Sequence, residues 1–180
     1  MSDKPAENSS EVQWIELLAS ERSSIEKLGR ELGIHPLENA RTELAGFDLA
    51  GVNDVQGESE GHGPDFDRAL GDRDTARACV LLAHQPVQIH DAVRHGVDLQ
   101  LSGHTHGGQV GLVSLGLDWT MMRLFVKAPD HGFWARGIDR LYVHRGTGHY
   151  GFPLRLGVPG EQSLLLVHST TLTANQPTPA

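Results

Sequence analysis

The sequence predicts an α/β fold, and two neighbouring stretches carry most of that prediction. Residues 78–83 are continuously apolar over the length of a strand, as in strands covered on both faces. Pro86 then suits the first turn of a helix, and Val97, Leu99 and Leu101 alternate as a second strand. A strand, a helix and a strand in this order form a β-α-β unit, whose strands run parallel with a right-handed crossover.

Further elements are expected on both sides of this unit. Ser10 and Gln13 form a capping-box pattern, and Gly33 suits the end of the helix that follows, because glycine accepts left-handed backbone. The predicted elements are a helix over about residues 11–32, strands at 34–37, 47–52, 141–143 and 163–167, and a short helix near 65–70. Residues 1–9 and 169–180 are expected to be disordered, with one partial domain over residues 10–168 between them.

Two stretches between these elements are interpreted as loops. Residues 53–64 are rich in Gly and Glu, and Asp54 and Asp65 are interpreted as turn and cap residues. Residues 107–137 are Gly-rich and are expected to form one long loop with local structure. Four large apolar side chains lie in that loop, and packing in the core is favoured for them over covering a site or binding an apolar substrate. They are Trp119, Met121, Met122 and Phe125.

Composition excludes several classes of protein. The chain has 180 residues, enough for one domain or part of a larger one, and a net charge of −8, which argues against general binding of nucleic acid. Its one cysteine, Cys79, excludes an internal disulfide and a four-cysteine zinc site, and indicates an inert buried thiol. No apolar run approaches the ~20 residues that span a bilayer. No signal-peptide stretch follows Met1, so the chain as written is expected to be soluble and cytoplasmic, with its localisation otherwise open.

The histidine content is high, with eleven in 180 residues. His84 follows the first buried strand, and His104 and His106 follow the second. Parallel strands end at the same edge of a sheet, and ligands of open α/β sheets bind at that edge. Neutral imidazole is a common ligand of divalent transition metals, so three convergent histidines indicate a metal site. The other eight histidines have no partner at a ligand spacing and are expected to be structural or on the surface.

The residues around this trio resemble a known family. The most specific stretch is Gly-His-Thr-His-Gly-Gly-Gln at residues 103–109, together with residues 82–86 on the preceding strand. Residues 37–39, 47–52, 141–148 and 153–157 are similar to one bacterial branch of that family. Over about residues 23–168, the chain thus resembles the calcineurin-like metallophosphoesterases.

The resemblance implies a fold, a reaction and a set of metal ligands. The fold would be the carboxy-terminal half of a four-layer α/β/β/α sandwich with mixed sheets. The reaction would be hydrolysis of phosphate mono- or diesters at a binuclear site of Mn, Fe or Zn ions. His84 and His104 would bind one metal ion and His106 the other. No catalytic residue is assigned, and Arg145 and Arg155 are interpreted as hydrogen-bonded loop residues rather than phosphate ligands.

The chain also departs from that family. No Asp-x-His box precedes residue 84, the one Gly-Asp pair (residues 71–72) lies in the wrong place, and residues 15–20 stand where the Asn-His box would fall. Of the family's metal ligands, only the three histidines remain. Two cations held close without a bridging carboxylate repel each other. The 180 residues alone are therefore expected to lack appreciable phosphoesterase activity.

Two hypotheses follow. In the first, the chain is a truncated phosphoesterase, whose missing half reflects a gene-model error, a frameshift or a separate chain. In the second, it is a non-catalytic remnant that binds a single metal ion or a protein partner. Half of a sandwich leaves a sheet without its partner, so exposed apolar surface and association through it are expected. Relatives in this branch are often attached to membranes, but the chain as written carries no such segment.

Overall fold

The computed structural model describes residues 29 and 31–166, and the chain divides into two compact units, Met1–Pro36 and Leu37–Ala180. In the first unit, Gly29 and Glu31 are helical and Gly33 has a φ of 69°, the left-handed conformation expected where a helix ends. The rest of the predicted helix over residues 11–32 and both predicted tails lie outside the described residues.

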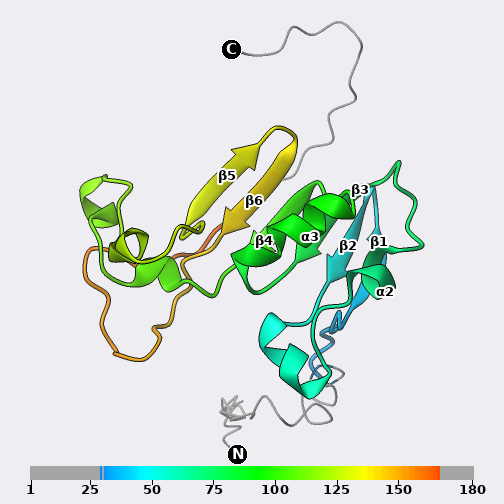
Figure 1. Cartoon of the computed structure of the whole chain (residues 1–180), viewed down its shortest axis with the longest axis horizontal. Coiled ribbons are helices and arrows are strands. Elements are labelled where there is room, and N and C mark those ends of the chain that lie inside the picture. The colour runs from blue at the N-terminus through cyan, green and yellow to red at the C-terminus, as the bar shows by residue number, and fades with distance from the viewer. Residues whose placement is uncertain (1–28, 30, 167–180) are drawn as a thin grey trace, which may run out of the picture. The chain divides into compact units, whose positions relative to one another are not determined.

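The second unit contains, within its described residues, one mixed sheet of six strands (Figure 1). The strands are β1 (Ala40–Leu44), β2 (Phe47–Gly51), β3 (Ala78–Leu82), β4 (Leu99–Ser102), β5 (Gly132–Arg136) and β6 (Asp139–Val143). Their order in the sheet is β1-β2-β3-β4-β6-β5. The four central strands run parallel, and an antiparallel strand flanks them at each edge. The α/β class and the parallel β-α-β unit are therefore confirmed.

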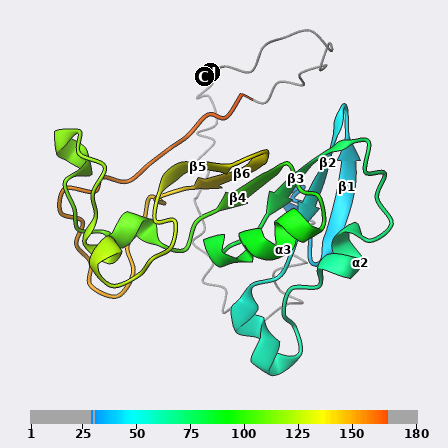
Figure 2. The ribbon, with the colours of Figure 1, turned by 45° about the horizontal axis from the view of Figure 1, so that its top comes forward.

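Two short helices lie over one face of this sheet (Figure 2). The helix α2 (Phe66–Leu70) begins after Asp65, whose carboxylate accepts a hydrogen bond from the Arg68 N–H at 2.9 Å. The helix α3 (Ile89–Arg94) continues from the 3₁₀ turn η2 (Pro86–Gln88), as the proline predicted. The core packs between these helices and the central strands. Its buried members are Ala50, Val52, Phe66, Ala69, Leu70, Cys79, Leu81, Ala83, Ala92 and Val97.

Cys79 is fully buried in that core. Burial raises the pKa of its thiol. Because the thiolate is the reactive form, both facts agree with the inert buried thiol expected from the sequence.

Three predictions about strands are wrong. Residues 34–37 form no strand, and the edge strand is β1 instead. The loop expected over residues 107–137 contains β5 at its end. Residues 163–166, the described part of the last predicted strand, form none. The two missed strands pair on one side only and are largely exposed, so they lack the continuous apolar run of a buried strand.

The connections contain four more 3₁₀ turns in the described part of the chain. They are η1 (Val55–Glu60), η3 (His106–Gly108), η4 (Val113–Leu115) and η5 (Met121–Leu124). The segment that carries η4 and η5 runs beside the chain that follows β6 (Figure 1), and the Gly111 N–H donates to the Leu156 carbonyl at 2.9 Å. These two segments, residues 107–131 (the first excursion) and 144–161 (the second excursion), pack on each other beyond the end of the sheet.

The prediction of core packing is wrong for most of the four large apolar side chains in the first excursion. Phe125 is 80% exposed, Met121 is 42% exposed and Trp119 is 36% exposed, whereas Met122 is half-buried. The reason is that η5 lies outside the layer between sheet and helices. Among the described residues, no helix is both long and apolar enough to cross a membrane.

Candidate metal-binding site

The carboxyl ends of β3 and β4 bring two of the predicted ligands together. Nε2 of His84 lies 3.3 Å from Nδ1 of His104, and the ring centroids are 5.1 Å apart. The parallel register that pairs Leu82 with Leu101 sets both histidines at the same edge of the sheet. Tetrahedral coordination with metal–nitrogen bonds of about 2.0–2.1 Å separates two ligand nitrogens by roughly 3.4 Å. The donor atoms of His84 and His104 therefore fit two positions around one metal ion.

His106 lies in the next turn, η3, and is oriented differently. Its Nδ1 is buried and has no hydrogen-bond partner. A buried polar atom is normally paired, so this nitrogen suits a bound ligand. His104 and His106 line one hollow of about 290 Å³, together with Met121, Phe125 and Tyr150. Met121, Met122 and Phe125, for which core packing was predicted, thus line the hollow beside these two histidines.

The predicted trio does not form one cluster. Among residues 29 and 31–166, no group of three or more His, Cys, Asp or Glu side chains is arranged to hold a metal ion. The structure pairs His84 with His104 and leaves His106 apart from that pair.

Asp54 is the carboxylate beside the pair. Its Oδ2 lies 3.8 Å from Nε2 of His84, and its Oδ1 accepts hydrogen bonds from the Gln56 N–H at 2.9 Å and the Gln85 amide at 2.7 Å. Asp54 caps η1, as its interpretation as a turn residue predicted. The sequence does not predict its approach to His84, because two residues thirty positions apart form no recognisable motif.

The loop that carries the other two histidines is tightly coiled. His104 and His106 have φ values of 69° and 51°, and Gly107 and Gly108 have 60° and 69°. Left-handed backbone is disfavoured for residues with a Cβ atom, so the two histidines need support from contacts around them. A Cβ atom at Gly108 would lie 2.8 Å from Cβ of Met122, which explains why glycine stands there.

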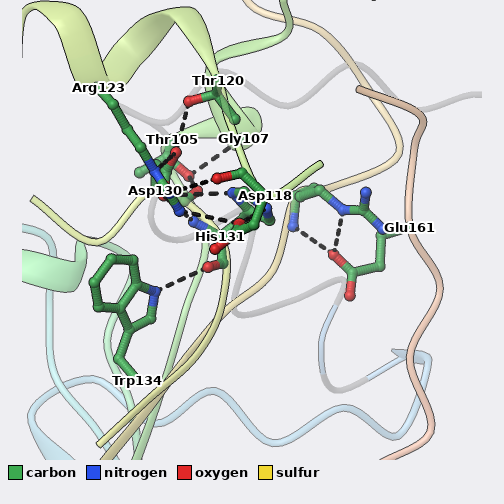
Figure 3. A network of polar contacts seen from close by, with 10 residues as sticks. Thr105, Gly107, Asp118, Thr120, Arg123, Asp130, His131, Trp134 and Glu161 are labelled. Carbon is green, nitrogen blue, oxygen red and sulfur yellow. Dashed lines mark hydrogen bonds and ion pairs between the residues drawn. The ribbon is translucent and has the colours of Figure 1, made fainter. Parts of the chain in front are cut away.

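Asp130 supports this loop from one side (Figure 3). The Thr105 hydroxyl, between the two histidines, donates to the Asp130 carbonyl at 2.6 Å and accepts from the Gly107 N–H at 3.3 Å. The Asp130 carboxylate is fully buried and accepts hydrogen bonds from the Thr120 hydroxyl at 2.6 Å and from Nε of Arg123 at 3.0 Å. Burial alone would raise the pKa of Asp130, but these bonds outweigh it and lower the pKa below its ordinary value.

The network around Asp130 also contains His131. Figure 3 shows His131 beside the side chains of Asp118 and Asp130. The His131 ring lies 3.0 Å from a carboxylate oxygen of Asp118 and 3.4 Å from one of Asp130. The structural role expected for His131 is confirmed. No sequence pattern points to Asp130, because the fold of an irregular segment sets its partners.

A second carboxylate, that of the half-buried Glu161, supports the chain that follows β6. It accepts hydrogen bonds from the Tyr142 hydroxyl, from the Ser163 hydroxyl at 2.7 Å, and from the backbone N–H and Nε of Arg145, both at 3.0 Å. Burial alone would raise the pKa of Glu161, but these hydrogen bonds lower it to about 2. Arg145 is therefore a hydrogen-bonded loop residue, as predicted.

Glu161→Gln is expected to destabilise the protein in a pH-dependent way. A carboxyl whose pKa falls on folding, here from 4.5 to about 2, stabilises the fold above pH 4.5 and loses that contribution as the pH falls towards 2. The shift corresponds to at most about 3 kcal/mol at neutral pH. Urea unfolding at about pH 7 and about pH 3 measures the gap between the two proteins, which shrinks at the lower pH. An equal gap at both pH values would refute this account of Glu161.

Comparison with known proteins shows what this chain is similar to. No family model and no solved structure matches the chain. A Helicobacter pylori (strain J99) protein named "Uncharacterized metallophosphoesterase" is 39% identical over 132 residues, which are 72% of this chain and 34% of that protein. "Uncharacterized metallophosphoesterase Cj0846" of Campylobacter jejuni is 32% identical, over 78% of this chain and 37% of its own length.

A vertebrate relative has the same kind of name. The zebrafish (Danio rerio) "Transmembrane protein with metallophosphoesterase domain" is 31% identical over 82% of this chain and 33% of its own length. The α/β sheet with histidines at its carboxyl edge and these similarities define one class of protein. The chain belongs to the calcineurin-like metallophosphoesterase family, with bacterial relatives. It spans about a third of the length of these relatives.

Proposed function

We propose that this chain contributes part of a binuclear metallophosphoesterase site, in which His84 and His104 bind one divalent ion and His106 binds the other. The observation that carries the proposal is the 3.3 Å separation of Nε2 of His84 and Nδ1 of His104 at the carboxyl edge of parallel strands. The unpaired buried Nδ1 of His106 supports a second position. Manganese, iron and zinc all accept imidazole nitrogen, and they are the ions proposed.

The substrate class proposed is phosphate mono- or diesters. Two bound metal ions of this kind supply a water nucleophile of lowered pKa and neutralise the phosphoryl oxygens. The part of this chain is to orient the imidazole nitrogens, through the strand ends for His84 and His104 and through the coiled loop for His106. The hollow beside His104 and His106 gives a phosphate ester room to approach them.

The architecture proposed is the carboxy-terminal half of a four-layer α/β/β/α sandwich. The helices α2 and α3 cover one face of the sheet and would form an outer layer. The opposite face would pack on a second sheet that lies outside these 180 residues. Exposed side chains such as Leu82, which is 40% exposed in the central strand β3, agree with such a partner, through which the chain would associate.

The 180 residues alone are expected to show no appreciable phosphoesterase activity. The histidine pair has no bridging carboxylate in the described part of the chain, so two ions would repel each other with little compensation. An assay of a generic phosphodiester, with Mn²⁺ added to the purified chain, tests this. Robust turnover that His104→Ala abolishes would overturn the expectation.

A second function is a non-catalytic remnant that binds one metal ion or a protein partner. The separation of His106 from the His84–His104 pair is the observation that favours it. Metal content by mass spectrometry separates the two proposals. Two ions per chain favour a complemented phosphoesterase site, and one ion or none favours the remnant.

A further inference from the structure

We propose that Arg155 is a positioning residue that holds His106 in its metal-binding orientation. This inference rests on the proposed function, in which His106 is a metal ligand, and it concerns how the chain fixes that ligand. Arg155 was expected only to be a hydrogen-bonded loop residue. Its hydrogen-bond partners indicate a more specific structural role.

The guanidinium of Arg155 donates only to backbone carbonyls in the part of the chain that the structure describes. Nη1 reaches the carbonyls of His106 at 3.0 Å and of Val158 at 3.4 Å. Nη2 reaches those of Arg145 at 2.7 Å and Gly146 at 3.3 Å, and Nε that of Gly148 at 2.7 Å. Because a guanidinium has five N–H donors, these five contacts occupy all of them. Arg155 is therefore directed at the backbone rather than at a phosphate.

These contacts join the histidine loop to the turn that follows β6. Arg155 binds the His106 carbonyl with one nitrogen and the carbonyls of residues 145–146 with another. A Cβ atom at Gly146 would lie 3.9 Å from Nδ1 of His106 and 3.8 Å from Nη2 of Arg155. The turn at Gly146 thus lies against both the unpaired imidazole nitrogen and the guanidinium.

The backbone of His106 needs such an anchor. Its φ of 51° is unfavourable for a residue with a side chain, and such conformations persist only where surrounding contacts determine them. The Asp130 carbonyl holds Thr105 from one side, and Arg155 holds the His106 carbonyl from the other. Without Arg155, the His106 carbonyl keeps the Gln109 N–H at 3.2 Å but loses its link to the turn at residues 145–146, and the direction of Nδ1 is less constrained.

Arg155→Lys tests this inference, with Arg140→Lys as the matched control. Lysine keeps the charge but cannot reproduce the planar five-donor fork. Arg140 also donates to carbonyls, those of Gly137 and Asp139, in the turn between β5 and β6. In the metal-free full chain, Arg155→Lys is expected to shift the NMR signal of the His106 ring, assigned with His106→Ala. Arg140→Lys is expected to leave that signal in place, and an unmoved signal in Arg155→Lys would overturn the inference.

Cobalt binding tests the consequence for the metal. Arg155→Lys is expected to weaken Co²⁺ affinity about tenfold, the scale of losing a group that orients a ligand. In a His106→Ala background the same change is expected to cost nothing further, because Arg155 acts through His106. An undiminished loss in that background would show a general effect on folding and refute the positioning role.

Two further results keep this inference separate from the proposed function. If His106→Ala leaves Co²⁺ affinity unchanged, His106 is not a metal ligand, and the part of the proposed function that assigns it to a metal ion is wrong. The NMR signal of the His106 ring still decides whether Arg155 positions that ring. If Arg155→Lys fails to fold, Arg155→Ala with millimolar guanidinium ion replaces it. Recovery of the His106 signal by the added ion supports the inference, and no recovery contradicts it.

Discussion

Asp130→Ala is expected to lower the free energy of unfolding by about 1–3 kcal/mol, the cost of leaving buried hydrogen-bond donors without their acceptor. The change removes the acceptor of hydrogen bonds from Thr120 and Arg123 in a site where the carboxylate is fully buried. It also loosens the carbonyl that holds Thr105, between the two histidines. Urea unfolding followed by tryptophan fluorescence measures the loss.

Asp118→Ala is the matched control for this prediction. Asp118 binds the same arginine, with Nη2 of Arg123 at 3.1 Å, but its side chain is 76% exposed. Exposed ion pairs contribute only about 0–1 kcal/mol, so a small loss is expected. Equal losses in the two variants would show that Asp130 is not the anchor of the excursion.

His104→Ala is expected to weaken binding of the first metal ion by more than about a hundredfold, beyond the range found for residues that only orient a ligand. The reason is that Nδ1 of His104 is one of the two facing nitrogens at the strand ends. His84→Ala is expected to have the same effect, because it removes the other. Isothermal titration with Mn²⁺ or Zn²⁺ measures both.

His149→Ala is the control for the histidine variants. His149 is an exposed histidine in the chain that follows β6, and it belongs to the eight for which no ligand role was expected. Its replacement is expected to leave metal affinity unchanged. A His104→Ala protein that binds metal as tightly as the His149→Ala protein would remove the basis of the proposed site.

The central part of the fold is predictable from the sequence because its signals are local. The apolar run of β3 and the proline before α3 fix a β-α-β unit without knowledge of the rest of the chain. The meeting of His84 and His104 follows from that unit, since parallel strands end at one edge. The roles of all three histidines as ligands remain a proposal that rests on this geometry.

The periphery is less predictable, for a physical reason. The edge strands β1 and β5 are stabilised by pairing with one neighbour, and their exposed residues carry no hydrophobic pattern. Asp130 and Arg155 act through backbone carbonyls and buried hydrogen bonds that arise only once irregular segments pack together. Such contacts leave no spacing in the sequence by which to find them.

The proposed sharing of one metal ion by His84 and His104 is tested most directly by anomalous diffraction from crystals soaked in Mn²⁺ or Zn²⁺. The predicted result is an anomalous peak within bonding distance, about 2.0–2.2 Å, of both Nε2 of His84 and Nδ1 of His104. A peak that contacts neither nitrogen, or no peak at the carboxyl ends of β3 and β4, would contradict the site.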